Sequence, residues 1–417
     1  MVSMQKERDR IRSLAGRIAA LAAHPREAQK IAAWRKLNDL EPERPLLWIT
    51  EIPWGEILDK HPELTVQCRN PKLRRLETGF LRTLFVARHL PCDQVIEGVY
   101  WVQKQITGYD RDFGLPVQDR QLAHEGGSHI RSHHYEPIIR EPEDIEKIKM
   151  PEVAYDEAAT LAEKDFCTRL FGDLLEVRLS GVRVCGFNPW DMLVRWTGVN
   201  EALMDLIARP DYLHAIMRRL TDSMLARIDQ LETQNLLDLS NPRERIGSGG
   251  AGYTTQLPQP DFDPAQVRPI DQWGSATAQI FGQVSPEMHD EFALRYEIEV
   301  LSRYGLNYYG CCEPLHNKMH LMAKIPRLRK VSISPWCEVA KAAEQARDRY
   351  VFSHKPSPAV FASEGFDGAR AERDMRERLE QSGGMPCEFI MKDISTIRGD
   401  VARLIEWCAR AWRIVAG

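Results

Sequence analysis

Short apolar runs alternate with amphipathic stretches along most of the chain, and this pattern predicts strands that alternate with helices. The stretches 4–23 and 26–39 carry apolar residues at helical spacing on a charged background and predict two N-terminal helices. Further helical patterns lie at 190–236, 338–347 and 368–381. The runs that predict strands are 46–50, 95–102, 182–187, 236–240, 306–311, 330–334, 349–353 and 387–391.

Strand–helix alternation predicts parallel strands with right-handed crossovers, and eight such units close most naturally into a (β/α)8 barrel. An open doubly wound sheet is the competing arrangement, but no Gly-x-Gly-x-x-Gly follows the first strand. We therefore expect a TIM barrel over 41–417, preceded by a helical extension over 1–40.

Composition narrows the class of protein. The 417 residues include 56 basic and 60 acidic side chains, with a net charge of -4 and no segment of one sign, so no nucleic-acid or anionic-membrane surface is expected. Charged residues interrupt every apolar run near the N-terminus, which argues against a signal peptide and a membrane span. Nine cysteines, an odd number in a long chain, are untypical of a disulfide framework. A cytoplasmic protein is expected.

In a barrel the active site lies at the carboxyl ends of the strands. The residues at those positions that suit acid–base catalysis are Glu51, His354 and Asp393. Aromatic and polar residues that suit binding of a small-molecule substrate are Trp54, Asn188, Trp190, Asn241, Trp336, Lys355 and Lys392. Each of them has a structural alternative, as a core or loop residue.

The stretch "NYYGCCEPLHNKMHLM" (307–322) gathers several metal-ligand side chains after the fifth predicted strand. Zinc takes three or four sulfur, nitrogen or oxygen ligands, and Cys311, Cys312, Glu313 and His316 are the candidates. The alternative is that the cysteines pack as small apolar residues and the histidines lie on a solvated helix. The loop "GSGGAG" (247–252) lacks the Lys-Ser/Thr of a P-loop, so a mobile loop closing over the site is expected instead of a nucleotide cradle.

Three segments together resemble the uroporphyrinogen decarboxylase superfamily, over about residues 40–417. They are "IFGQVSPEMHDEFALRYEIEVLSRYGLNYYGCCEP", with Ser285, Pro286 and Phe292, then "GFNPWDMLVRWTGVNEALMDLIARPDYLHAIMRRL", and "RYVFSHKPSPAVF". The decarboxylase branch of that family carries an arginine-rich loop after its first strand, matched to a substrate with many carboxylates. Here the position reads "TEIPWGEI", with Glu51 and Glu56, which would repel that substrate.

The methyltransferase branch of the superfamily implies zinc, held by a His-x-Cys after the fifth strand and a cysteine after the eighth. Here Gly310-Cys311-Cys312-Glu313 stands at the first position and Met391-Lys392-Asp393 at the second, so the histidine and the last cysteine are replaced. The resemblance also implies a corrinoid, and since no Asp-x-His-x-x-Gly occurs here, a separate partner protein must carry it.

The resulting hypothesis is an enzyme that transfers a methyl group between a small, aromatic or methoxylated substrate and a corrinoid protein. The alternative enzyme class is a cofactor-free lyase or decarboxylase on a small carboxylic acid, with Lys355, Lys392 and His354 holding the carboxylate and Asp393 or Glu51 moving the proton. A third hypothesis is a non-catalytic barrel that binds a tetrapyrrole or corrinoid. The sequence leaves a monomer and a homodimer open.

Overall fold

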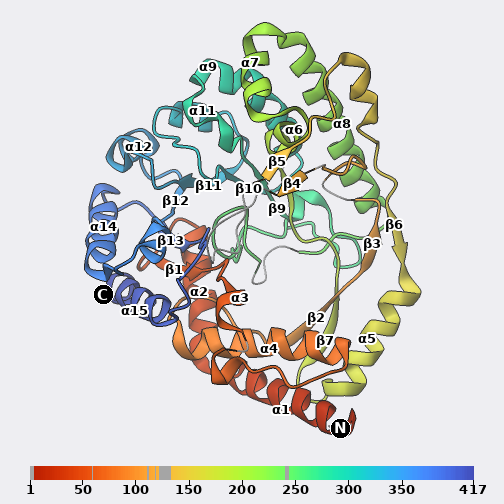
Figure 1. Ribbon diagram of the computed structural model, residues 1–417, viewed down its shortest axis with the longest axis vertical. Helices are drawn as coiled ribbons and strands as arrows, with labels where there is room; N and C mark the ends of the chain where they lie inside the picture. Colours follow the sequence, from red (N-terminus) through yellow and green to blue (C-terminus); the bar gives the residue numbers. More distant parts are fainter. Residues whose placement is uncertain (1–3, 59, 110–111, 118, 122–132, 240–243) are drawn as a thin grey trace.

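A parallel sheet of seven strands, in the order β1-β13-β12-β11-β10-β9-β8, forms the centre of the protein (Figure 1). The computed structural model describes residues 4–58, 60–109, 112–117, 119–121, 133–239 and 244–417. The seven strands are β1 Leu46–Ile49, β8 Cys185–Phe187, β9 Trp273–Ala276, β10 Leu306–Tyr309, β11 Leu328–Ile333, β12 Val351–His354 and β13 Cys387–Met391. Helices connect the parallel strands, so the protein is of the α/β class, as expected.

Helices surround this sheet (Figure 1). They are α1 Met4–Ala22, α2 Pro25–Asn38, α3 Trp54–Ile57, α4 Pro71–His89, α5 Glu157–Phe171, α6 Pro189–Thr197, α7 Val199–Ala208, α8 Pro210–Thr233, α9 Pro286–His289, α10 Arg295–Leu301, α11 Met319–Met322, α12 Val339–Ala346, α13 Ala359–Ala362, α14 Gly368–Gln381 and α15 Ala402–Ala416. Shorter turns of 3-10 helix lie at Pro62–Leu64, Pro142–Lys147, Pro269–Asp271 and Gln279–Gln283, with a π-helical turn at Asp290–Leu294. Within the described ranges, every helix is too short or too polar to cross a bilayer.

A second, two-stranded parallel sheet joins β2 (Val99–Gln103) to β7 (Glu176–Ser180). Residues 181–184 alone separate β7 from β8, so one extended segment contributes a strand to each parallel sheet. No ladder between β1 and β2 is present in the described part of the chain. Instead, residues of both strands, including Trp48 and Trp101, line a cavity of about 1130 Å³.

Two small antiparallel pairs complete the strands. They join β3 (Gln105–Thr107) to β6 (Ala154–Asp156) and β4 (Asp119–Gln121) to β5 (His133–Tyr135).

One predicted strand does not form, and two strands of the parallel sheets, β7 and β9, are not predicted by the apolar pattern. The predicted strand at 236–240 does not form over its described residues, where Leu237 makes only an isolated bridge to Val182. The strand between β8 and β10 is β9, which the apolar pattern does not predict because Gly274 and Ser275 interrupt it. Small residues are required there, since a Cβ on Gly274 would lie 2.5 Å from Asn307 Oδ1 and 2.6 Å from the Tyr304 ring.

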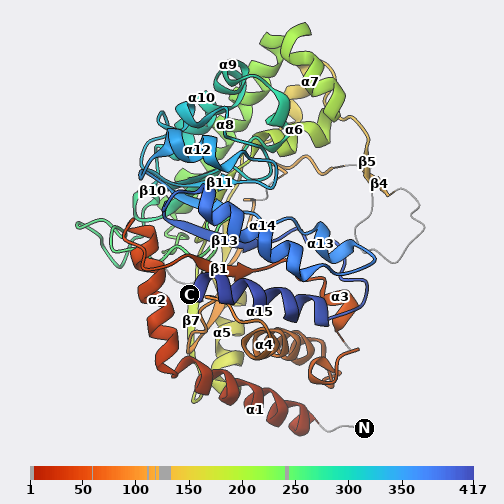
Figure 2. The same ribbon diagram turned by 90° about the vertical axis from the view of Figure 1, so that its left-hand side faces the viewer.

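The two predicted N-terminal helices are confirmed as α1 and α2. Helix α1 buries Ile11, Leu14 and Ile18 and runs beside α4 (Figure 2). Helix α2 packs Trp34 into a cluster that includes Leu46 and Val351, the first residues of β1 and β12. Helix α2 therefore covers the amino ends of the strands, on the side opposite the expected active site.

Candidate functional site at the carboxyl ends of the strands

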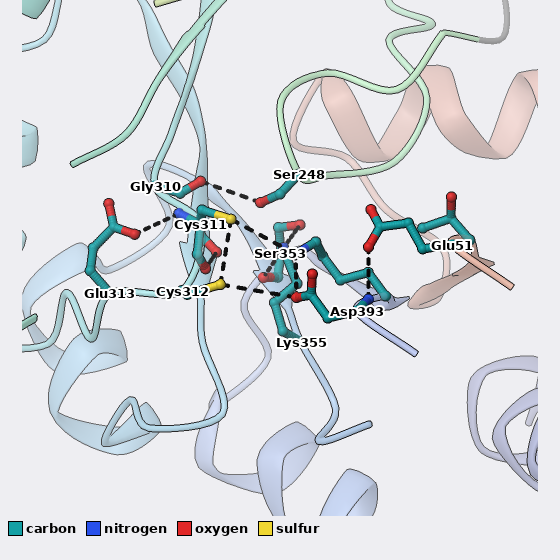
Figure 3. Close-up of polar contacts among 12 residues, drawn as sticks. Glu51, Ser248, Gly310, Cys311, Cys312, Glu313, Ser353, Lys355 and Asp393 are labelled. Atoms are coloured by element: carbon teal, nitrogen blue, oxygen red, sulfur yellow. Dashed lines mark hydrogen bonds and ion pairs between the residues drawn. The ribbon is translucent and has the colours of Figure 1, made fainter. Parts of the chain in front are cut away.

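The two adjacent cysteines follow β10 and are fixed through their backbone. Gly310 has φ +95, a conformation that only glycine adopts easily, and it turns the chain out of the strand. The Cys311 backbone N–H donates to Glu313 Oε2 at 2.8 Å, and the Cys311 carbonyl accepts from Ser332 Oγ at 2.7 Å. The two sulfur atoms lie 3.6 Å apart, in front of the residues that follow β12 and β13 (Figure 3).

Cys311 is the more acidic thiol of the pair. Lys392, the first residue after β13, places its Nζ 3.8 Å from Cys311 Sγ. The hydrogen bond from Cys312 and the charges of Lys392 and Lys355 lower the pKa of Cys311 to about 7, against the opposing effect of burial. The neighbouring Cys311 sulfur and burial raise the pKa of Cys312. Of the two sulfur atoms, Cys311 is therefore the one that loses its proton first, and Cys312 keeps its proton.

Acidic groups that follow β1 and β13 continue this cluster. Asp393 forms an ion pair with Lys392, and its Oδ2 lies 4.0 Å from Cys312 Sγ. The Asp393 backbone N–H donates to Glu51 Oε2 at 2.8 Å, and Arg245 Nη1 lies 3.3 Å from Glu51 Oε1. Glu51 (φ +53) and Asp393 (φ +55) both adopt the left-handed backbone conformation, which is costly for residues other than glycine and is frequent at functional sites. The two carboxylates, Glu51 and Asp393, thus lie between the cations Arg245 and Lys392, and Lys392 also lies beside Cys311.

Lys355, the first residue after β12, is buried beneath the cysteines. Its Nζ donates to Ser353 Oγ at 2.7 Å, to the Ser353 carbonyl at 2.8 Å and to Tyr308 Oη at 3.1 Å. Burial lowers the pKa of Lys355 to about 7, whereas three oxygen acceptors suit the ammonium form. We assign the ammonium form to Lys355, because each of its three N–H bonds has an acceptor.

A fully buried ion pair lies further inside. Lys330 Nζ is 2.8 Å from Glu388 Oε2, and Ser353 Oγ donates to Glu388 Oε1 at 2.7 Å. Glu388 Oε1 also accepts the Gly250 backbone N–H at 2.9 Å. The interior of the sheet is therefore polar and hydrogen-bonded from Glu388 up to Lys355.

The glycine-rich loop forms part of this buried interior, so its prediction as a mobile loop over the site is wrong. Ser248 Oγ lies 2.8 Å from Tyr308 Oη, and a Cβ on Gly249 would be 2.7 Å from Glu388 Oε1. A Cβ on Gly250 would be 2.3 Å from Trp34. The glycines allow the loop backbone to fit between helix α2 and the carboxylate of Glu388.

The structure does not bring the four predicted zinc ligands together. Glu313 accepts from Thr277 Oγ1 at 2.8 Å as well as from the Cys311 N–H, and it is almost fully buried. His316 Nε2 lies 2.9 Å from Glu338 Oε1, and His316 Nδ1 accepts the Glu338 N–H. Within the described residues, no group of three or more His, Cys, Asp or Glu side chains is arranged to hold a metal ion. The side chains present at Cys311 do not fit zinc, because Lys392 supplies the cation beside that sulfur.

The remaining predicted residues are dispersed. His354 Nε2 lies 2.9 Å from Ser382 Oγ and its ring stacks on Phe389, so it faces away from the cluster, toward α14. Trp190 is fully buried and donates to the Phe292 carbonyl at 3.0 Å, as a core residue does. These two positions do not support the predicted catalytic and substrate-binding roles.

Three predicted substrate-binding residues, Trp54, Trp336 and Asn188, lie in other surroundings. Trp54 packs against Phe85 of α4 and lines the 1130 Å³ cavity. Trp336 is 75% exposed, and Asn188 is half-buried where α6 begins. Asn241 lies outside the described residues.

Residue spacing does not predict Arg245 and Tyr308, which contact the predicted cluster. The sequence does indicate the buried ion pair, because Lys330 and Glu388 are charged residues within the predicted strands "KVSIS" and "CEFIM". Comparison with protein-family models and with curated proteins returns no match to this chain. The cluster of Cys311, Lys392, Asp393 and Glu51 is therefore the candidate functional site.

Proposed function

We propose that the protein is a methyl-transferring enzyme in which Cys311 gives and takes the proton that accompanies transfer. The observation that carries this proposal is the position of Cys311 Sγ, 3.8 Å from Lys392 Nζ, with a pKa of about 7. A group whose pKa lies near the ambient pH exchanges its proton in both directions, which is what general acid–base catalysis needs.

A (β/α)8 barrel is the architecture that we propose for this activity. Support comes from the β7–β8 segment, because it joins the β2–β7 sheet to the seven-stranded sheet. Following the ladders gives the order β2, β7–β8, β9, β10, β11, β12, β13 and β1, which is eight parallel strands. The cluster around Cys311 then lies at the carboxyl face, where barrel enzymes carry their active sites.

In the proposed reaction, the bond between a methyl carbon and an oxygen, nitrogen or sulfur atom of a small substrate breaks. The heteroatom keeps the bonding electron pair and takes the proton of Cys311, while the methyl carbon passes to an acceptor that supplies a new electron pair. A corrinoid on a separate protein would supply that acceptor chemistry. Lys392 and Lys355 stabilise the thiolate that remains. In the reverse direction the thiolate of Cys311 takes the proton back.

One observation favours the lyase alternative, namely that two cations, Lys392 and Arg245, lie at this site beside the carboxylates of Asp393 and Glu51. A substrate carboxylate would need those cations for binding. Lys392 already pairs with Asp393, and Arg245 with Glu51, so the substrate would have to displace both pairs. The transfer hypothesis requires no such displacement.

The test is methyl transfer from methylcobalamin to small thiols or phenols, and from methoxylated aromatics to cob(I)alamin, measured against pH. We expect a rate that depends on one group with an apparent pKa near 7, and we expect Cys311→Ser to lose the activity and that dependence. Cys337→Ser is the matched control, because Cys337 is buried and its thiol pKa is raised to about 11. A Cys311→Ser variant that transfers methyl at the normal rate would overturn the proposal.

A further inference from the structure

A separate cavity of about 430 Å³ lies where β2 ends and β7 passes into β8. Cationic side chains line it from three directions, with Lys104 after β2, Arg183 before β8 and Arg227 on α8. Glu244 is the acidic residue of the lining. The volume lies within the range that small-molecule sites occupy.

Arg183 is held rigidly in this cavity. Its Nη1 lies 3.1 Å from Glu244 Oε1, its Nε lies 3.4 Å from Asp238 Oδ2, and its side chain is 4% exposed. The guanidinium carbon of Arg183 is 4.0 Å from the centre of the Trp101 ring, so contact with the aromatic face helps to fix the orientation of the guanidinium group. Nη2 of this guanidinium is buried and makes no hydrogen bond.

Arg227 is also buried, at 5% exposure, and its charge has no carboxylate partner within the described ranges. Its Nη1 donates to the Tyr109 carbonyl at 3.2 Å and its guanidinium lies 5.5 Å from the Phe113 ring centre. Its Nε is buried without a hydrogen-bond partner. A buried guanidinium without an acid is costly, and each buried donor left unpaired costs further free energy.

Lys104 adds a third positive charge at the same cavity. Its Nζ donates to the Asn235 carbonyl at 2.7 Å, and burial lowers its pKa. Among the described residues, three cations line the cavity with one carboxylate, and that carboxylate and Asp238 both pair with Arg183. Within the same described residues, Lys104 and Arg227 form no ion pair, so their charges would favour an anionic ligand.

We propose that this cavity binds a small organic anion, whose carboxylate or phosphate group pairs with the charges of Lys104 and Arg227. The half-buried Ile106 and Tyr109 in the lining would contact the apolar part of the ligand. The site does not involve Cys311 or Lys392, so this proposal does not depend on the proposed methyl transfer. Absence of anion binding would therefore leave the methyl-transfer proposal untouched, and absence of methyl transfer would leave this one untouched.

The test is calorimetric titration of the purified protein with benzoate, with phenyl phosphate and with inorganic phosphate, at constant ionic strength. We expect saturable binding of at least one of these, and the strongest of the three identifies the anionic group. Arg227→Met should weaken it about tenfold or more, since a hydrogen bond from a charged donor contributes that much. Cys311→Ser should bind it like the unchanged protein.

Lys104→Gln is the second variant, because the half-buried Lys104 can be replaced even if Arg227→Met fails to fold. It should weaken binding severalfold. Arg218→Gln is the matched control on the same helix, where Arg218 pairs with Asp222 and Glu299 at the surface, and it should have no effect. Absence of binding by all three anions would overturn the proposal, as would binding that Lys104→Gln and Arg227→Met leave unchanged.

Discussion

Lys392 Nζ lies 3.8 Å from Cys311 Sγ, so the residue that follows β13 places an ammonium group against the thiol that follows β10. The resemblance to zinc methyltransferases implied a metal beside this cysteine. In this chain a side chain provides the positive charge, and a covalently attached cation cannot be removed by chelation.

Replacement of Lys392 by Met should make Cys311 less reactive. The charge of Lys392 lowers the pKa of Cys311, so its loss should raise that pKa and reduce the thiolate fraction at pH 7. We expect alkylation of Cys311 by iodoacetamide at pH 7 to slow by about fivefold for a rise of one pKa unit, because the thiol is about half ionised when its pKa is about 7. Peptide mass spectrometry measures the rate for each cysteine. Lys341→Met, on the exposed side of α12, is the control, and an equal rate in both variants would contradict the prediction.

Glu297→Gln should change the pH dependence of stability. Burial raises the pKa of Glu297 to about 8, and the carboxyl accepts from Tyr309 Oη at 2.7 Å. A raised pKa means that the folded protein prefers the protonated acid. The stability that this provides is complete below the ordinary pKa of 4.5 and is lost as the pH rises through 8. Between pH 4.5 and pH 8 this contribution to the free energy of unfolding falls by about 1.4 kcal/mol per pH unit.

The glutamine variant stays neutral, so the difference in Tm between the unchanged protein and Glu297→Gln should turn in favour of the variant between pH 5.5 and pH 8.5. Differential scanning calorimetry at these two pH values measures it. Parallel curves for the two proteins would show that Glu297 is ionised in the fold.

Gly250→Ala should destabilise the protein. The added Cβ would lie 2.3 Å from Trp34 and 2.9 Å from Glu388 Oε2, so either helix α2 or the buried ion pair must shift. We expect a loss of about 1–3 kcal/mol, the usual cost of overpacking, in urea unfolding. Gly16→Ala is the matched control, because a Cβ at Gly16 in α1 meets nothing within 4 Å, and it should stabilise the helix slightly.

Glu388→Gln should be among the most damaging single changes. Lys330 and Glu388 are both fully buried, and removal of the carboxylate leaves the Lys330 charge without its partner. Breaking such a pair costs about 3–5 kcal/mol. The urea midpoint should fall accordingly, while Glu43→Gln in an exposed pair with Lys36 should leave it unchanged. Recovery of stability in Lys330→Met/Glu388→Leu would assign the loss to the unpaired charge.

The sequence predicted the strands that are continuous apolar runs, and these include β1, β10, β12 and β13. It did not predict β9, because the requirement there is steric: Gly274 is small to admit Asn307 and Tyr304, and that need is set by neighbours distant in sequence. The run at 236–240 is apolar in the same way as a strand, but β9 lies at the place in the sheet where that strand was expected. Apolar spacing does not distinguish these two cases.

The position of the candidate site can be predicted from the sequence, but the residues that contact it are harder to predict. Glu51, Cys311 and Asp393 each follow a predicted strand, and they lie together because parallel strands end at one face. The orientation of His354 was not predictable, because it depends on which residue of β12 faces inward, and Ser353 does. Arg245 reaches Glu51 from a loop nearly two hundred residues away, as the sequence numbering shows.

Trp34 of α2 fills the space beside Gly250, so helix α2 closes the polar interior on the amino side of the sheet. A chain that began at β1 would leave a hollow the size of an indole next to the buried Lys330–Glu388 pair. Water entering there would hydrate that pair from the amino side of the sheet and weaken the field that acts on Lys355. The chemistry at one face of the sheet therefore depends on keeping the opposite face dry.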